Sequence, residues 1–296
     1  MKVSGKTRVC AVIGDPVEHS LSPCIHNAAF RHLGLDYVYV AFTVKKDALK
    51  EAIQGMRGLG IYGLNVTMPH KVEIIPHLDR LDETAEKAGS VNTVLNDGEL
   101  IGYSTDGFGA VNALKAHGRD PHGKKVVILG AGGASRSISS SIAEEAKEFT
   151  ILNRTVEKAK ALAGKISSVI GREVRWGGLS GDLLAEELMD ADIVINATSL
   201  GMHPNDSETP INKNLLREDM VVFDLVYDPL ETRLLREAKS VGAQTIDGLT
   251  MLIYQGAASF EIWTGRKAPV DIMMKAAREE LEKNEEAKRS EMKWPR

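Results

Sequence analysis

A glycine-rich turn that joins an apolar strand to a helix is the clearest chemical signature in the sequence. The apolar run 126–129, rich in β-branched residues, leads into Gly130-Ala131-Gly132-Gly133-Ala134, and the usual third glycine is replaced by Ser135. Such a turn lets the backbone approach a pyrophosphate closely and directs the free N–H groups of the helix start towards the negative charge. The turn therefore predicts dinucleotide binding. The alternative, on this stretch alone, is a tight turn that binds nothing.

The segment after the next strand indicates which dinucleotide would bind. An NAD site carries an acidic residue there for the ribose 2′-hydroxyl, whereas this sequence reads Asn153-Arg154-Thr155, with Lys158 one turn later. Arg154 and Lys158 would attract a 2′-phosphate, so the segment favours NADP over NAD. An ordinary surface arginine at a helix start is the alternative.

Two segments before the turn could bind a small polar substrate. Ser20-Leu21-Ser22-Pro23 places two hydroxyls beside a helix start, which suits a carboxylate, although a simple N-cap explains the same pattern. Asn65, Thr67 and Lys71 follow a buried strand, and ligands of open α/β sheets bind at the carboxyl ends of strands. A lysine there could donate a proton; the alternative is an exposed lysine in a first helical turn.

Further polar residues follow strands or open helices. Asn92 precedes a strand, and Asp106 opens a predicted helix, where capping is the simple explanation. Thr198 and Leu225 follow two buried strands of the nucleotide region, where a nicotinamide or an adenine would lie, and Gly248 closes that region.

Alternating strands and helices must position these residues. In the first third we expect strands at 9–13, 37–44 and 61–66, helices at 24–33 and 46–56, and a helix that Pro69 opens. This order implies an α/β unit with a largely parallel sheet. Asn96-Asp97-Gly98 predicts a hairpin.

The middle of the chain alternates more regularly. After a helix at 106–117, we expect strands at 126–129, 149–152, 193–195, 221–223 and 243–246, with helices at 156–166 and 230–241. This is typical of a doubly wound dinucleotide domain, which we assign to residues 107–247. Residues 1–106 and 248–296 would then form the substrate-binding and catalytic domain, if the last helices return to it. Residues 279–296 read as a charged helix or tail.

Composition excludes several classes of function. A chain of 296 residues exceeds one ordinary core, and 43% apolar residues are typical of a globular protein. The net charge of -4 leaves no basic excess for a nucleic-acid partner. We expect no membrane span, because no apolar run is long enough, and no secretory leader.

The cysteines and histidines point to a reduced, metal-free protein. Cys10 and Cys24 could pair but cannot form a disulfide framework, so a cytoplasmic location is the better prediction. The His and Cys spacings match no zinc pattern, so we expect no metal.

Taken together, these segments resemble the shikimate dehydrogenase family along nearly the whole chain. The resemblance is carried by Ser20-Leu21-Ser22-Pro23, Asn65-Val66-Thr67-Met68-Pro69-His70-Lys71, Ser90-Val91-Asn92-Thr93, Thr105-Asp106-Gly107, the glycine turn, Asn153-Arg154-Thr155, Asn196-Ala197-Thr198, Tyr227-Asp228-Pro229, Asp247-Gly248-Leu249 and Gln255. It implies an N-terminal α/β substrate domain, a Rossmann-type doubly wound NADP-binding domain, and C-terminal helices that return to the substrate domain. The family's turn tolerates a small residue such as Ser135.

The resemblance implies a reaction. The family reduces 3-dehydroshikimate to shikimate reversibly with NADPH, on the chorismate route to aromatic amino acids. Lys71 matches the family's catalytic lysine and Asp106 its partner carboxylate. Hydride would move between the nicotinamide and C3 of the ring, while Lys71 exchanges the proton on that oxygen.

The same matching assigns the binding residues. The substrate carboxylate would contact Ser20, Ser22, Thr67 and Tyr227, and the ring hydroxyls would contact Asn65, Lys71, Asn92, Asp106 and Gln255. The cofactor would contact Gly130, Ala131, Gly132, Gly133, Ala134, Asn153, Arg154, Thr155, Lys158, Thr198, Leu225 and Gly248.

Two alternatives stay open. The first is a quinate/shikimate dehydrogenase that uses NAD or NADP; Arg154 and Ser22 favour the shikimate-specific, NADP-using branch. The second is a non-catalytic NADP-binding regulatory module, which would be expected to lose Lys71 or Asp106. A small-molecule substrate is the expected partner, and the sequence leaves both a monomer and a homodimer open.

Overall fold

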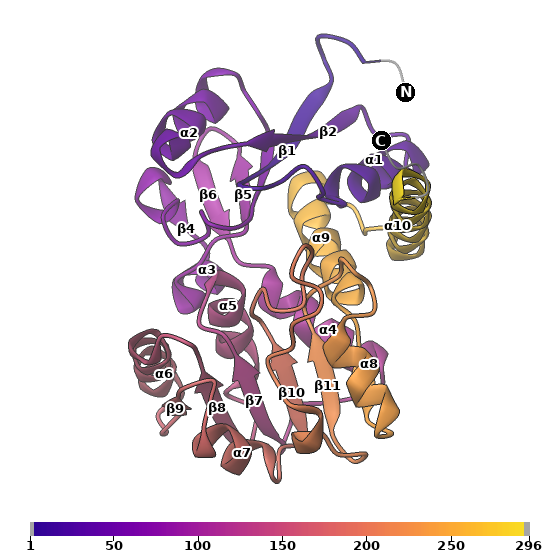
Figure 1. The fold of residues 1–296 in the computed structure, drawn as a ribbon. Helices are drawn as coiled ribbons and strands as arrows, with labels where there is room; N and C mark the ends of the chain where they lie inside the picture. The colour runs from indigo at the N-terminus through magenta and orange to yellow at the C-terminus, as the bar shows by residue number, and fades with distance from the viewer. Residues whose placement is uncertain (1–2, 293–296) are drawn as a thin grey trace. The chain divides into compact units, whose positions relative to one another are not determined.

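Two six-stranded sheets organise residues 3–292, the part of the chain that the computed structural model describes (Figure 1). The chain divides into two units, each with one sheet. The first unit comprises Met1–Leu81, Val91–Tyr103 and Gly256–Arg296. The second comprises Asp82–Ser90 and Ser104–Gln255. The sequence prediction of an α/β fold with a Rossmann-type domain is confirmed.

The sheet of the first unit is mixed, with the strand order β2-β1-β3-β5-β6-β4. Its strands are β1 (Arg8–Gly14), β2 (Tyr37–Thr43), β3 (Gly63–Val66), β4 (Arg80–Leu81), β5 (Thr93–Asn96) and β6 (Leu100–Tyr103). β1 pairs in parallel with both β2 and β3, as expected. The predicted hairpin joins β5 to β6, and these two strands run antiparallel because a short turn permits no other direction.

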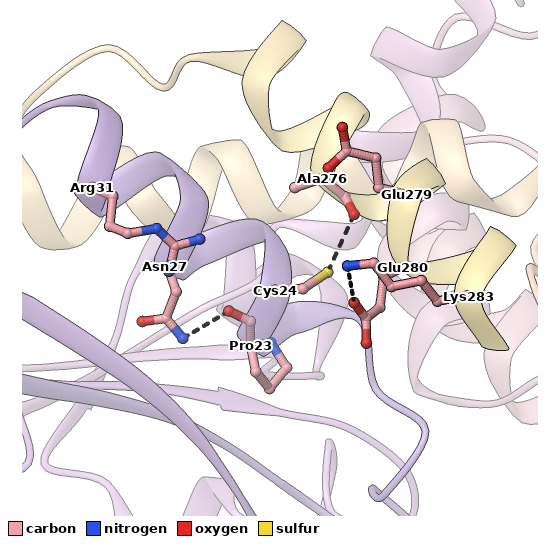
Figure 2. A pocket seen from close by; sticks show the side chains of 8 residues that line it. All are labelled: Pro23, Cys24, Asn27, Arg31, Ala276, Glu279, Glu280 and Lys283. Atoms are coloured by element: carbon pink, nitrogen blue, oxygen red, sulfur yellow. Dashed lines mark hydrogen bonds and ion pairs between the residues drawn. The ribbon is translucent and has the colours of Figure 1, made fainter. Parts of the chain in front are cut away.

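Helices from both ends of the chain cover the first sheet. They are α1 (Ser22–His32), α2 (Leu49–Gly58) after the 3₁₀ turn η1 (Lys46–Ala48), the Gly256–Thr264 part of α9 (Gly248–Thr264), and α10 (Val270–Met292). α10 packs against α1, so the C-terminal helices return to the first unit as predicted. The hollow between α1 and α10 is lined by Cys24, Arg31 and Glu280, among others (Figure 2). Residues 293–296 of the predicted tail lie outside the described residues.

Two local predictions in the first unit are wrong. Ser22 is not an N-cap but the first residue of α1, and Leu21 holds the cap position. No long helix follows Pro69 either: residues 71–74 form turns, and the 3₁₀ helix η2 (Ile75–His77) follows. Pro76 explains this, because it donates no backbone hydrogen bond and disfavours a helical conformation at the residue before it.

The sheet of the second unit is entirely parallel, with the order β12-β11-β10-β7-β8-β9. Its strands are β7 (Lys125–Leu129), β8 (Glu148–Leu152), β9 (Arg175–Gly177), β10 (Ile193–Asn196), β11 (Val221–Asp224) and β12 (Gln244–Ile246). Strands β7, β10 and β11 are buried along their whole length, as expected for strands covered on both faces. The strand order reverses at β7, the point where doubly wound sheets bind nucleotides.

The second unit's helices match the predicted alternation, with two additions. They are α3 (Glu83–Ala88), α4 (Asp106–Ala116), α5 (Gly133–Ile142), α6 (Val156–Ile170), α7 (Asp182–Leu188), α8 (Arg233–Ser240), η3 (Lys213–Leu215) and the start of α9. The short helices α3 and α7 were not predicted. Among the described residues, no helix combines the length and the apolar character needed to cross a bilayer.

An aromatic cluster fills the core of the first unit beneath α1 and α9. The rings of Phe30, Tyr37 and Phe260 stack, and the Trp263 indole donates to the Val94 carbonyl over 3.0 Å. A Cβ at Gly63 would lie 2.6 Å from the Trp263 ring. Glycine at the start of β3 therefore lets the indole lie directly on the strand.

The imidazole of His26 is completely buried in this cluster, and it should make stability depend on pH. Neither ring nitrogen has a hydrogen-bond partner among the described residues, and burial lowers the pKa of His26 from 6.5 to about 3. Below about pH 6.5 the unfolded chain takes up a proton that the folded chain refuses, so this group lowers stability as the pH falls towards 3.

Replacing His26 should therefore flatten the pH dependence. Between about pH 6.5 and about pH 4.5, wild type should lose about 2–3 kcal/mol more unfolding free energy than His26→Leu. Urea unfolding followed by circular dichroism measures this difference, with His122→Leu, at an exposed turn, as the control. Equal pH slopes for wild type and His26→Leu would show that His26 is not buried as a neutral ring.

Candidate active site

The carboxyl edge of the first sheet gathers six of the predicted substrate-binding residues: Ser20, Ser22, Asn65, Thr67, Lys71 and Asn92. The serines follow β1, and Asn65 and Thr67 lie at the end of β3. The Thr67 N–H donates to the Ile13 carbonyl over 2.9 Å, so the ends of β1 and β3 remain paired. The Ser20 hydroxyl accepts the Ser22 N–H over 3.3 Å.

Backbone hydrogen bonds bring Lys71 and Asn92 to the same edge. The Val91 N–H donates to the Lys71 carbonyl over 2.7 Å. The Val66 N–H, next to Asn65, donates to the Asn92 carbonyl over 2.9 Å. The structure thus places the segments of Lys71, Asn92 and Asn65 side by side, although they are far apart in the sequence.

Close packing fixes the turn that carries Lys71. A Cβ at Gly14 would lie 2.3 Å from Thr67 Cγ2, so only glycine allows β1 to end this close to the turn. His70 is fully buried, and its Nε2 lies 2.6 Å from the Val44 carbonyl oxygen. His70 therefore packs against the strand end, and its neighbour Lys71 is held at the edge.

In the second unit, Asp106 and Gln255 are brought together. Asp106 is the first residue of α4 and is buried. Thr105 Oγ1 donates to the Gln255 carbonyl over 3.1 Å, and a Cβ at Gly109 would lie 2.8 Å from Gln255 Cβ. α4 and α9 therefore approach closely where they carry these two side chains. Tyr227 lies in the loop after β11.

The first turn of α4 is also tied to the nucleotide helix α5. The Gly107 N–H donates to Ser137 Oγ over 2.8 Å, and Ser104 Oγ donates to the same atom over 2.8 Å. A Cβ at Gly107 would lie 2.5 Å from the Ser137 carbonyl oxygen. Ser137 thus satisfies a backbone N–H next to Asp106 that helix geometry leaves without a partner.

The glycine turn has the shape that a pyrophosphate needs. Gly130 has a φ of +112°, and a Cβ there would lie 2.8 Å from the Ala197 carbonyl oxygen. Gly132 caps α5, and a Cβ there would meet nothing within 4 Å among the described residues, so the helix start is open. Ser135 Oγ donates to the Gly130 carbonyl over 2.6 Å. The residue that replaces the third glycine therefore closes the turn and does not block it.

The arginine segment lies beside this turn. The Gly130 N–H donates to the Leu152 carbonyl over 2.7 Å, and Asn153 directly follows. Asn153 Nδ2 donates to the Thr155 carbonyl over 2.8 Å, and Arg154 and Lys158 are exposed. A ribose phosphate beside the turn would therefore meet two accessible cations, which fits NADP.

A buried carboxylate organises the other predicted cofactor loops. Asp224 accepts from Asn196 Nδ2 over 2.9 Å and from Thr232 Oγ1 over 2.7 Å. The Asn196 Oδ1 atom in turn accepts the Thr198 hydroxyl over 2.7 Å. Burial raises the pKa of Asp224 to about 6, against the hydrogen bonds that lower it. This network fixes the loop of Thr198 next to the end of β11.

Gly248 completes this part of the second unit. A Cβ there would lie 2.3 Å from the Leu225 carbonyl oxygen, so α9 begins in contact with the loop that follows β11. Thr198, Leu225 and Gly248 are therefore held together. No cluster of three or more potential metal-ligating side chains occurs within residues 3–292.

Sequence reasoning missed three residues that organise the site: Tyr39, Ser137 and Asp224. Tyr39 lies on the edge strand β2, where a tyrosine in a strand pattern indicates only packing, and Asp224 ends the buried strand β11. Ser137 lies in a helix, where serine has no distinctive signal. Their roles depend on contacts with distant segments, such as Tyr39 with Asn65.

Comparisons with known proteins agree along the chain. Family models match in three places: the shikimate dehydrogenase substrate binding domain at residues 12–94, the shikimate/quinate 5-dehydrogenase model at 112–250, and the shikimate 5′-dehydrogenase C-terminal domain at 248–278.

Relatives and solved structures extend the likeness to whole chains. A shikimate dehydrogenase (NADP⁺) from Methanopyrus kandleri is 49% identical and covers 95% of this chain and 98% of its own. The enzyme of the same name from Methanocaldococcus jannaschii is 50% identical, covering 95% and 100%. A crystal structure of a shikimate dehydrogenase in complex with NADP⁺ is 49% identical, with a TM-score of 0.89 over 95% of this chain and 98% of that one.

Substitution of Ser137 should test the link between α4 and α5. Ser137→Ala leaves the Gly107 N–H and the Ser104 hydroxyl without this acceptor in a buried place, which should cost about 1–3 kcal/mol of unfolding free energy. Ser139 is also buried on α5, but its hydroxyl has no partner among the described residues. Ser139→Ala should therefore change stability by less than about 0.5 kcal/mol. Equal losses in urea titrations of the two variants would contradict the link.

Proposed function

Because the chain belongs to the shikimate dehydrogenase family, we propose that Lys71 and Asp106 carry the acid–base chemistry of its reaction. That reaction is the reversible, NADPH-dependent reduction of 3-dehydroshikimate to shikimate. The proposal is supported above all by the polar carboxyl edge of the first sheet, where backbone hydrogen bonds hold the Lys71 turn beside Asn92 and Asn65. NADPH, when bound, supplies the hydride that C3 of the ring accepts.

Lys71 moves the proton. Its Nζ donates a proton to the oxygen on C3 as the carbonyl becomes a hydroxyl, and it takes a proton back when shikimate is oxidised. Its backbone is fixed through the Val91 N–H, so the flexible part is the side chain alone.

Asp106 holds the neighbouring hydroxyl of the ring, as the counterpart of the family's partner carboxylate. It begins α4, where the positive end of the helix dipole stabilises a carboxylate. Thr105 and Gly107, on either side of it, are bonded to α9 and to α5 respectively. The carboxylate is therefore set on a rigid support, as a catalytic group requires.

Neutral groups bind the rest of the substrate. Ser20, Ser22, Thr67 and Tyr227 supply hydroxyl donors for the carboxylate, and Asn65, Asn92 and Gln255 bind ring hydroxyls. A buried polyol needs each hydroxyl satisfied, and a site of this kind rejects analogues that lack one.

The second unit binds the cofactor. The glycine turn and the open start of α5 hold the pyrophosphate, and Arg154 with Lys158, beside Asn153 and Thr155, holds the 2′-phosphate. The loops of Thr198, Leu225 and Gly248 face the nicotinamide or the adenine. In this assignment residues 107–247 form the NADP-binding domain, and 1–106 with 248–296 form the substrate-binding and catalytic domain.

We also propose that the protein works in the cytoplasm on small molecules, without a nucleic-acid or membrane partner. Cys10 and Cys24 are both free thiols, which suits a reducing compartment. The net charge of -4 offers no electrostatic attraction to a polyanion.

Substitution of Lys71 tests the catalytic proposal. Lys71→Ala should lower kcat for shikimate oxidation by about 10²–10⁴-fold, because it removes the proton carrier, while the KM for shikimate changes much less. NADPH absorbance measures the rate, with Lys50→Ala, an exposed lysine of α2, as the control. A kcat near wild type would remove Lys71 from this role.

Faster turnover of wild type with quinate and NAD than with shikimate and NADP would contradict the substrate and cofactor assignment.

Substitution of Arg154 tests cofactor choice. Arg154→Ala removes a charge-assisted contact with the 2′-phosphate and should raise the KM for NADP by about 10–100-fold, with little change for NAD. Lys160→Ala is the matched control, because Lys160 is an exposed cation on α6, the helix that follows Arg154, and lies over the Trp176 ring, 5.3 Å from its centroid. If Arg154→Ala raised the KM values for NADP and NAD equally, Arg154 would be excluded from the phosphate site.

A further inference from the structure

We propose that Tyr39 is a positioning residue that sets the Asn65 amide for shikimate binding. Tyr39 lies on β2, an edge strand of the first sheet, and does not belong to the predicted site. The inference rests on the proposed function of Asn65 as a substrate-binding residue.

The phenol hydroxyl of Tyr39 donates to Asn65 Oδ1 over 2.7 Å. This hydrogen bond uses the single proton of the phenol, so the hydroxyl cannot donate to a second acceptor. Burial raises the pKa of Tyr39 well above its ordinary value, so the donor keeps its proton.

This contact decides how Asn65 presents its amide. Asn65 Nδ2 is directed at three acceptors: the Asn92 carbonyl at 3.0 Å, Thr93 Oγ1 at 3.2 Å and Ser259 Oγ at 3.0 Å. Both N–H bonds of the Asn65 amide are used by these atoms. Asn65 can therefore bind a ring hydroxyl chiefly as an acceptor, through the second lone pair of Oδ1. The Tyr39 proton occupies the first lone pair and thereby fixes the direction of the second.

Tyr39 itself is held on three sides by α1. The ring stacks on His26 with centroids 4.5 Å apart and planes 8° from parallel. Asn27 Oδ1 accepts the Tyr39 N–H over 2.9 Å, and Asn27 Nδ2 donates to the Tyr39 carbonyl over 2.8 Å. The same Nδ2 also donates to the Pro23 carbonyl in the first turn of α1 (Figure 2). His26 and Asn27 thus fix the ring and the backbone of one tyrosine.

Packing alone would not require this arrangement. Tyr37, two residues earlier on β2, is also buried in the aromatic cluster. Its hydroxyl accepts from Arg8 over 2.8 Å and donates to the Trp263 carbonyl over 3.4 Å, and neither partner belongs to the proposed site. The two tyrosines share strand, burial and ring packing and differ in what their hydroxyls hold. Tyr37 is therefore a matched control.

The test compares Tyr39→Phe with Tyr37→Phe, because each variant keeps the ring and loses only the hydroxyl. Tyr39→Phe should raise the KM for shikimate by about 5–20-fold, the size expected when one buried hydrogen-bond partner is lost. Its KM for NADP should stay within about twofold of wild type. In Tyr37→Phe, the KM for shikimate and the KM for NADP should both stay within the same range. Thermal unfolding and NADP binding show that each variant is folded.

Asn65→Ala, alone and combined with Tyr39→Phe, separates the inference from the proposed function. If Tyr39 acts through Asn65, the double variant should bind shikimate only about as poorly as Asn65→Ala alone. Three results would overturn the inference and leave the site assignment intact. The KM for shikimate could rise equally in both tyrosine variants, it could stay unchanged in Tyr39→Phe, or the effects of the two substitutions on KM could be fully additive in the double variant. An unchanged KM in Asn65→Ala would instead reject the proposed role of Asn65, and the inference with it. If Tyr39→Phe does not fold, Asn27→Ala, which frees the Tyr39 backbone, replaces it. Additive effects of Asn27→Ala and Asn65→Ala on the KM for shikimate would then overturn the coupling.

Discussion

Parallel strands end at a common edge of a sheet, and the chemistry of this protein depends on that constraint. In the first sheet, β1 and β3 run side by side, so residues 20–22 and 65–71 must emerge close together. In the second sheet, β7, β8, β10 and β11 do the same for the glycine turn, the arginine segment and the loops of Thr198 and Leu225. The regular layers bury the apolar side chains, and the loops at each edge are left to carry polar groups.

The polar groups at these edges are held by partners that do no chemistry themselves. Tyr39 orients Asn65, Ser137 supports the start of α4, and Asp224 ties the loop of Thr198 to β11. Each is buried, and each hydrogen bond matters because an unsatisfied polar group in that place would be costly. Glycines have the complementary role, since Gly14, Gly107 and Gly248 let backbones approach where a Cβ would collide.

Much of this architecture could be predicted from the sequence, because local patterns decide it. The run from β7 through the glycine turn into α5, the hairpin between β5 and β6, and the alternation after residue 148 all follow from periodicity and turn residues. The short elements β4, β9, α3 and α7 have too few residues to show a period. The helix expected after Pro69 is wrong because Pro76 interrupts it. Residues such as Ser137 were missed because their partners are distant in the sequence: Ser137 accepts the Gly107 N–H, 30 residues away.

The central claim is that Lys71 and the residues around Asn65 surround the reacting end of the substrate. The most direct measurement is a crystal structure of the protein with both shikimate and NADP⁺ bound. We expect Lys71 Nζ to lie within about 2.6–3.2 Å of the oxygen on C3, and a ring hydroxyl to donate to Asn65 Oδ1 while the Tyr39 hydrogen bond persists. Shikimate bound with the C3 oxygen away from Lys71, or an Asn65 amide turned away from Tyr39, would contradict it.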